Sequence, residues 1–301
     1  MQLLPHLTIG HATLTDKGTG LSAFLFDKPV ICGAWLCGSA PGLAGTTPFL
    51  QLGMTVNVAH GLLLTGGSVF GLDALAGVRR FQQVRGIGLD TGSACVPSIP
   101  GACIYDLDEK TPESPCAEDA FKACQAATSV TTSGPVGAGC GATVGKIVNQ
   151  AAWDQGGFGC AEVCGQDMLR VQAFVVVNAA GDIVNKAGEI IAGAKRGNAF
   201  ADTVRCLKNG EYGLTAFETG IMNTTLVAVV TNASLDKNAL VCVAKMASAG
   251  MASAIKPAFT PLDGDIVYAF STQTVSAPET LVGTLAAQAV QEAIIAAVGG
   301  R

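Results

Sequence analysis

The bond between Asn223 and Thr224 is the feature of this sequence with the clearest potential for chemistry. Residues 220–233 read GIMNTTLVAVVTNA, so a small polar pair opens an apolar run that predicts a β-strand over 224–231. A hydroxyl at the first residue of a strand can attack the preceding carbonyl, because the chain can be cut there without breaking the sheet. An N-to-O acyl shift and hydrolysis would leave Thr224 with a free α-amine, whose reference pKa of about 7.7–8.0 lets it accept the hydroxyl proton at neutral pH. The segment is thus a candidate self-processing nucleophile, although the same residues also suit an ordinary strand.

Two carboxylates precede a second predicted strand. Residues 260–270 read TPLDGDIVYAF, which puts Asp263 and Asp265 at positions i and i+2, on one face of extended chain. Such a pair can divide its work, one acid accepting hydrogen bonds from a nucleophile while the other holds the first in position. The same spacing also suits a turn or a cation site. The acids are therefore a candidate site on equal terms with a turn.

Three glycine-rich segments, over 64–72, 134–145 and 156–159, do not match a nucleotide-binding motif. The run GAGCGATVG lacks a strand directly before it and an acid about 20 residues after it. Lys146 follows this run, but Ile147 stands where a phosphate-binding loop needs Ser or Thr. We expect these glycines to let backbones approach closely, or to line a small pocket with N–H groups.

Composition excludes several classes of function. The 301 residues are 49% apolar and 14% charged, which is enough for a large core, and a net charge of −5 provides no attraction for nucleic acid or an anionic membrane. The uncharged stretch over 29–72 is broken by prolines, glycines and polar residues, so it does not predict a membrane span. The N-terminus carries no pattern for export, and we expect a cytoplasmic protein.

Cysteine and histidine usage argues against a metal or disulfide framework. The eleven cysteines are odd in number and lie inside apolar runs, as small buried side chains do, and only three histidines are present. We expect no metal and no cofactor. His11 is expected to satisfy a buried polar contact, and His60 to be a core residue.

The order of elements predicts one α/β unit over residues 1–301. Strands are expected over 21–26, 171–178, 224–231 and 265–271, and helices over 68–84, 117–127, 237–255 and 278–298. No linker is long enough to separate two domains.

Six blocks in order resemble the L-aminopeptidase/D-esterase and β-aminopeptidase family of N-terminal nucleophile hydrolases, and within it the branch that hydrolyses nylon oligomers. They are IGHAT at 9–13, LLLTGGSVFGLDALAGV at 62–78, VPSIPGACIYDL at 96–107, GPVGAGCGATVGK at 134–146, NTTLVAVVTNASL at 223–235 and TPLDGDIVYAFST at 260–272. The resemblance covers nearly the whole chain. It implies a four-layer αββα sandwich, cleavage into pieces 1–223 and 224–301, and a homotetramer of processed protomers that acts on a small amide or short peptide.

The resemblance also implies roles for single residues. Thr224 falls at the nucleophile, and Asp263 and Asp265 fall at paired acids that the β-aminopeptidases replace with Ser and Glu. Lys146 and Asn178 fall where the nylon-hydrolase branch has a site lysine and asparagine, with an orienting or oxyanion role. Tyr105 lies in a block with a pocket tyrosine. Without the resemblance, Lys146 would be interpreted as a solvated lysine at a strand end and Asn178 as a turn residue.

Three alternatives stay open at this point. Ornithine acetyltransferases share the fold and a threonine nucleophile, so an amine could replace water as the acyl acceptor. The chain could also be a non-catalytic, oligomeric binding protein whose Asn223–Thr224 bond stays intact. Asn223 could further break the chain by cyclising, although a β-branched residue after it slows that reaction.

Overall fold

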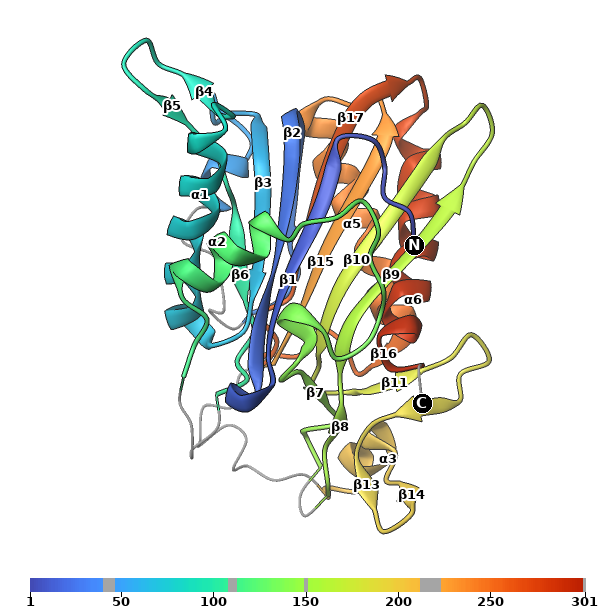
Figure 1. Ribbon diagram of the computed structural model, residues 1–301. Coiled ribbons are helices and arrows are strands. Elements are labelled where there is room, and N and C mark those ends of the chain that lie inside the picture. The colour runs from blue at the N-terminus through green and yellow to red at the C-terminus, as the bar shows by residue number, and fades with distance from the viewer. Residues whose placement is uncertain (40–46, 108–112, 149–150, 212–222, 300–301) are drawn as a thin grey trace.

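One extended ladder of strands forms the centre of the molecule. The computed structural model describes residues 1–39, 47–107, 113–148, 151–211 and 223–299, and its main sheet has eight strands in the order β6-β3-β2-β17-β15-β10-β9, with β1 beside β2 (Figure 1). These strands are β1 (Leu7–Leu14), β2 (Thr19–Leu36), β3 (Val58–Thr65), β6 (Gly101–Cys103), β9 (Gly157–Cys164), β10 (Arg170–Asn178), β15 (Thr224–Ala233) and β17 (Ile266–Val275).

The long strand β2 belongs to two layers. Its first part pairs with β1 and β3, and residues 31–36 pair with β17. Side chains of β1, β2 and β3 form one apolar cluster with side chains of β9, β10, β15 and β17, which include Phe158, Phe174 and Tyr268. The two halves of the ladder therefore face each other across an apolar interior, which we call the inter-sheet layer.

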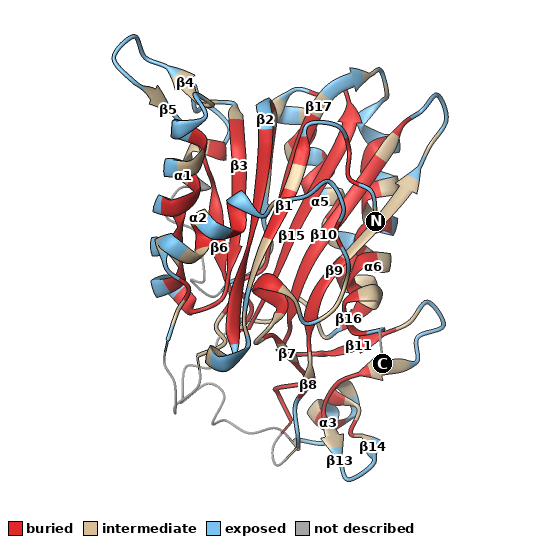
Figure 2. Cartoon of the chain, viewed as in Figure 1, coloured by how far each residue is buried: buried red, intermediate tan, exposed pale blue. Residues whose placement is uncertain are grey.

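Helices cover both outer faces. Helices α1 (Leu75–Val84) and α2 (Ala117–Gln125) bury Val78 and Ala120 against Leu21 and Leu63 of the first half of the ladder. Helices α5 (Lys237–Ala254) and α6 (Glu279–Val298) pack on β10, β15 and β17. Buried residues follow the strands and the inner sides of these helices in Figure 2. The order is helix, sheet, sheet, helix, and the expected αββα sandwich is confirmed.

Shorter elements border this sandwich. They are β4 (Leu89–Asp90), β5 (Cys95–Val96), β7 (Thr143–Val144), β8 (Asp154–Gln155), β11 (Asp182–Val184), β12 (Ile190–Ala192), β13 (Lys195–Arg196), β14 (Ala199–Phe200), α3 (Thr203–Lys208) and β16 (Ile255–Lys256). Strands β12, β11 and β16 form a small sheet of their own, and the other strands pair as β4-β5, β7-β8 and β13-β14.

The expected elements are all present, with one correction. The segment predicted as one helix over 68–84 begins with a 3-10 turn, Ser68–Ala74, before α1. Gly67 and Ser68 have left-handed φ values of 78° and 56°, and the α-helix therefore starts only after this turn. Gly71 lies so close to the Gly66 carbonyl that a side chain would overlap it.

Helix α6 has the length and composition of a membrane-spanning helix, but it packs on the outer face of the sheet as one layer of the sandwich. An 18-residue window of this helix has a mean hydropathy of 1.6, and half of that window is buried within the protein. Because α5 and β9 flank it on different sides, it is apolar in several directions. Gly159 of β9 lets the helix backbone at Ala293 approach the sheet, since a β-carbon there would overlap the Ala293 carbonyl. This is the close approach of backbones expected for the third glycine-rich segment.

Candidate functional site

The Thr224 and Asn178 side chains lie next to each other at one end of the inter-sheet layer. Strands β10 and β15 are antiparallel, and their register places Asn178 directly opposite Thr224. Alternation along β15 puts Leu226 and Ala228 in the inter-sheet core and Val227 on the side of α5 and α6. Thr224 shares the inter-sheet face, whereas its neighbour Thr225 faces the helices. Of the two adjacent threonines, only Thr224 can meet Asn178.

The carbonyl of Asn223 is held by two donors. The Thr224 hydroxyl donates a hydrogen bond of 2.6 Å to the Asn223 carbonyl oxygen, and the N–H of Gly264 donates one of 2.7 Å to the same atom. The N–H of Asn223 itself donates to the Leu262 carbonyl at 3.0 Å. The hydroxyl is thus placed at the bond that it would attack. The Gly264 N–H lies where negative charge would develop on the carbonyl oxygen.

Asp263 and Asp265 are buried behind this bond. Asp263 accepts hydrogen bonds from the Thr260 N–H at 2.8 Å and the Thr260 hydroxyl at 2.6 Å, and Asp265 accepts one of 2.6 Å from the Thr225 N–H. Burial raises the pKa of both carboxyls, and the charge of Asp263 further raises the pKa of Asp265. The two acids are therefore close enough to compete for ionisation, as a pair with divided roles requires.

Lys146 is a fully buried lysine, which corrects the interpretation of this residue as solvated. Its Nζ donates a 2.8 Å hydrogen bond to Asn178 Oδ1 and lies 5.9 Å from the centre of the Trp153 ring. Burial lowers the pKa of Lys146 to about 7, against the charges of Asp263 and Asp106, which favour the ammonium form. A lysine in this range can hold or release a proton at neutral pH.

Asn178 is the last residue of β10 and is buried, so the interpretation as a turn residue is also corrected. Its Oδ1 accepts hydrogen bonds from Lys146 Nζ and from the Thr143 N–H at 3.0 Å, and its Nδ2 donates to the Tyr105 carbonyl at 3.1 Å. No other hydrogen bond in the described part of the chain uses the second hydrogen of Nδ2. These bonds fix the amide in one orientation beside Thr224.

Tyr105 reaches the site through its main chain. The Tyr105 carbonyl accepts the hydrogen bond from Asn178, and its half-buried side chain makes no hydrogen bond within the described residues. Its assignment as a pocket tyrosine stays a prediction.

Asp106 is a residue of this region that the sequence analysis did not single out. Its carboxylate accepts a 2.6 Å hydrogen bond from the Gly67 N–H and a 2.8 Å bond from the Thr19 hydroxyl. Burial raises the pKa of Asp106 to about 6. One feature of the sequence could have indicated Asp106: it is an acid directly after the apolar run ACIY, in a chain whose glycine-rich segments match no nucleotide-binding motif.

The histidines take no part in this cluster. His11 Nδ1 lies 2.8 Å from the Ser22 hydroxyl and Nε2 lies 3.0 Å from the Thr131 hydroxyl, which confirms its structural role. His60 is buried in β3, as expected for a core residue. All eleven cysteines are free thiols. Among the described residues, no group of three His, Cys, Asp or Glu side chains is placed to hold a metal ion.

Comparisons with known proteins identify the family and the fold of this chain. The sequence matches the model of peptidase family S58 over residues 4–299. An uncharacterized aminopeptidase of Mycobacterium tuberculosis is 34% identical over 97% of this chain and 87% of that protein. A 6-aminohexanoate-oligomer endohydrolase of Paenarthrobacter ureafaciens is 29% identical over 92% of this chain and 76% of its own length.

A solved structure supports the fold. The L-aminopeptidase D-Ala-esterase/amidase of Ochrobactrum anthropi, described as a variant of the N-terminal nucleophile hydrolase fold, superimposes with a TM-score of 0.69 at 19% identity, covering 98% of this chain and 84% of that one. Because the family model and the mycobacterial relative both span nearly the whole sequence, this chain belongs to peptidase family S58, a family of peptide- and amide-bond hydrolases.

Proposed function

We propose that this protein is a self-processing amide hydrolase whose nucleophile is Thr224. The observation that carries the proposal is the Asn223 carbonyl oxygen, which accepts hydrogen bonds from the Thr224 hydroxyl and the Gly264 N–H at 2.6 and 2.7 Å. The first contact places the nucleophile, and the second stabilises the oxyanion that attack would produce.

Self-cleavage would proceed in two steps. The Thr224 hydroxyl oxygen bonds to the Asn223 carbonyl carbon, the carbon–nitrogen bond breaks, and the hydroxyl proton is transferred to the departing nitrogen. The product is an ester with a free α-amine on Thr224. Water then adds across the ester, restoring the hydroxyl and leaving a carboxylate on Asn223, so the chain becomes pieces 1–223 and 224–301.

The same residues would serve the mature enzyme. The α-amine of Thr224 takes the hydroxyl proton as the threonine attacks a substrate amide, and it returns a proton to the leaving amine. Asp265 holds the N–H of Thr225 and so fixes the start of the strand that carries the nucleophile. The hydrogen of Asn178 Nδ2 that no described residue accepts would be available to an oxyanion, while Lys146 orients that amide from its other side. Water then releases the acyl group.

The substrate class is a small amide or a short peptide. The two curated relatives are named as an aminopeptidase and as an endohydrolase of 6-aminohexanoate oligomers. Both names describe cleavage of an amide bond, and we extend that coarse class to this chain. Water as the acyl acceptor separates this activity from that of an acyltransferase, whose product would depend on an added amine.

We also propose that the protomers assemble into a homotetramer in the cytoplasm. Several large apolar side chains are exposed on the single chain, as expected for a surface that another subunit covers: Trp35, Leu36, Leu52, Met54 and Phe70. Light scattering on the eluting protein would measure the assembly, and a monomeric mass would contradict it.

Intact-mass spectrometry under denaturing conditions tests the self-processing. The wild-type protein is expected to give two masses that sum to 30.4 kDa plus one water, with Thr224 as the new N-terminus. Thr224→Ala is expected to give one uncut chain without turnover, and Thr224→Ser, which keeps a hydroxyl, is the matched control and should still split. Cleavage of the alanine variant would overturn the proposal, because it would point to cyclisation of Asn223. A wild-type chain that stays whole on long incubation would favour the non-catalytic alternative.

A further inference from the structure

Two glycine-rich segments converge on one carboxylate, that of Asp106. The Gly67 N–H donates to Asp106 Oδ1, and a side chain at Gly66 would overlap Oδ2 and the Thr19 hydroxyl. A β-carbon at Gly141, in the second segment, would lie 2.6 Å from the same Oδ2. The absence of side chains at these glycines therefore makes room for an internal acid rather than for a phosphate.

Asp106 stands directly behind the candidate site. The neighbouring residue, Tyr105, presents the carbonyl that accepts the hydrogen bond from Asn178 Nδ2. Asn178 in turn accepts from Lys146 Nζ, and it lies opposite Thr224 in the sheet. Whatever fixes the main chain at residues 105–106 thus fixes one side of the Asn178 amide.

The charge of Asp106 also acts on the site. Two carboxylates influence Lys146, namely Asp263 from the segment before β17 and Asp106 from the segment after β6, and both favour its ammonium form. Among the residues that the structure describes, the titratable groups that interact with Asp106 are Lys146 and the thiols of Cys103 and Cys140. Burial raises the pKa of both thiols, so they stay neutral near pH 7.

We propose that Asp106 is a positioning residue of this site: its carboxylate holds the two glycine-rich segments and the main chain behind Asn178, and its charge favours the ammonium form of Lys146. This inference rests on the proposed function. Asp106 acts through Asn178 and Lys146 and not by contact with the reacting atoms.

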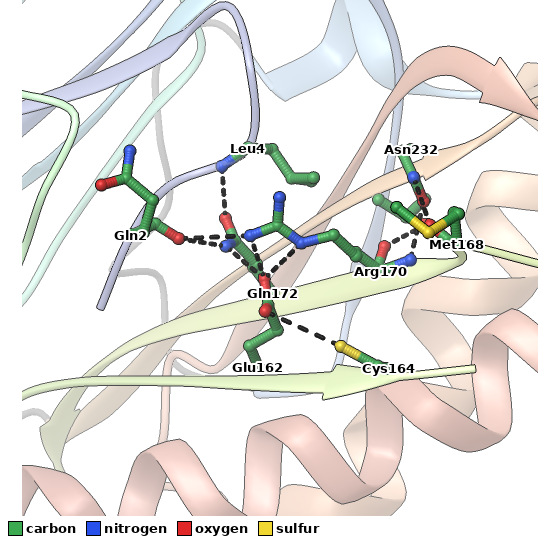
Figure 3. Close-up of polar contacts among 9 residues, drawn as sticks. Gln2, Leu4, Glu162, Cys164, Met168, Arg170, Gln172 and Asn232 are labelled. Carbon is green, nitrogen blue, oxygen red and sulfur yellow. Dashed lines mark hydrogen bonds and ion pairs between the residues drawn. The ribbon is translucent and has the colours of Figure 1, made fainter. Parts of the chain in front are cut away.

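Asp106→Asn tests the proposal, because it keeps the size of the side chain and removes the charge. We expect kcat at pH 7.5 to fall about tenfold with little change in KM. The alkaline limb of the kcat profile should move to lower pH, since Lys146 would lose its proton more easily. Glu162→Gln is the matched control, because it makes the same chemical change in a hydrogen-bonded carboxylate near the opposite end of β10 (Figure 3). In this variant the acidic and alkaline limbs of the kcat profile should both keep their wild-type pH values.

A second measurement needs no activity. In Thr224→Ala protein labelled with 13C at lysine Cε, NMR titration follows Lys146, whose signal is assigned by its loss in Lys146→Met. Adding Asp106→Asn should lower the pKa of Lys146. Failure of self-cleavage in the wild type would overturn the proposed function and leave this titration interpretable.

A third variant covers the case in which Asp106→Asn does not fold. Thr19→Val removes one hydrogen-bond donor from the Asp106 carboxylate and so raises the pKa of Asp106. Because Asp106 then carries less negative charge, the pKa of Lys146 should fall, as in Asp106→Asn but by a smaller amount. The proposal is overturned if neither the alkaline limb nor the Lys146 titration moves in whichever variant folds, even when its thermal stability falls.

Discussion

The two ends of β10 carry the same kind of side chain in opposite settings. Gln172 and Asn178 are both buried amides on the inter-sheet face, six residues or about 20 Å apart along the strand. Gln172 Oε1 accepts the Leu4 N–H at 3.0 Å, and its Nε2 donates to the Gln2 carbonyl and to Glu162. We call these the Gln172 end and the Asn178 end.

Charge balance distinguishes them. At the Gln172 end, Glu162 and Arg170 form an ion pair of 2.7 Å with both side chains about a quarter exposed, so each charge has a partner and some water. At the Asn178 end, two acids and a lysine are buried. Burial raises the pKa of each acid and lowers the pKa of the lysine, so that it favours the neutral form of all three groups. Both ends contain an amide, acids and a cation. Desolvation of the charged groups suits the Asn178 end to proton transfer, whereas the Gln172 end holds the N-terminal segment in place.

The largest expected difference comes from removing each amide. Asn178→Ala should lower kcat by about 10²–10³-fold, the usual effect of losing an oxyanion donor. Gln172→Ala should leave kcat unchanged and lower the free energy of unfolding by about 1–3 kcal/mol, because the buried Leu4 N–H loses its acceptor. Steady-state kinetics and urea denaturation measure both, and equal losses of activity would erase the distinction between the two ends.

The second largest difference in activity is expected when the cationic side chain at each end, Lys146 or Arg170, is replaced. Lys146→Met keeps the length and bulk of the side chain and should lower kcat by about tenfold to a hundredfold, because the Asn178 amide loses a donor that orients it. Arg170→Met is the control at the Gln172 end and should retain wild-type kcat. A fully active Lys146→Met protein would show that this lysine has only a packing role.

The pH dependence of folding stability should also differ between the two ends, because Asp265 is buried at the Asn178 end. The pKa of Asp265 is raised in the folded state, chiefly by burial and then by Asp263, so its contribution to stability is fully present below about pH 4 and is lost as pH rises through the folded pKa. In a Thr224→Ala background, which keeps the chain whole, the stability of Asp265→Asn relative to its parent should increase as the pH rises above about 4. Urea denaturation at several pH values measures the difference, and parallel curves would contradict it.

The smallest effect is expected at the Gln172 end. Glu162→Gln should cost roughly 1 kcal/mol at low salt, the usual contribution of a partly exposed ion pair. Most of that loss should disappear in 1 M salt, where screening acts over about 3 Å. Denaturation at two salt concentrations checks this, and a cost that persists in high salt would mean that hydrogen bonding to Gln172 outweighs the charge pair.

Much of the fold could be predicted because its signals are local. The strands β10, β15 and β17 contain continuous runs of apolar residues such as Val and Phe, and α5 and α6 repeat apolar residues at helical spacing. The break at Ser68 was missed, since a left-handed residue before a helical pattern leaves the pattern intact. Asp106 was missed because its partners, Thr19 and Gly67, are 87 and 39 residues away.

The sequence by itself determined where the candidate nucleophile stands, because a polar Asn-Thr pair before an apolar run places Thr224 at the first residue of a strand. It also placed two acids before the next strand. Only the tertiary structure decided that Thr224 faces Asn178, that Lys146 is buried against that amide, and that the Gly264 N–H meets the Asn223 carbonyl. The reason is physical: strand register and desolvation depend on which distant segments pack together, and no local pattern of residues contains that information.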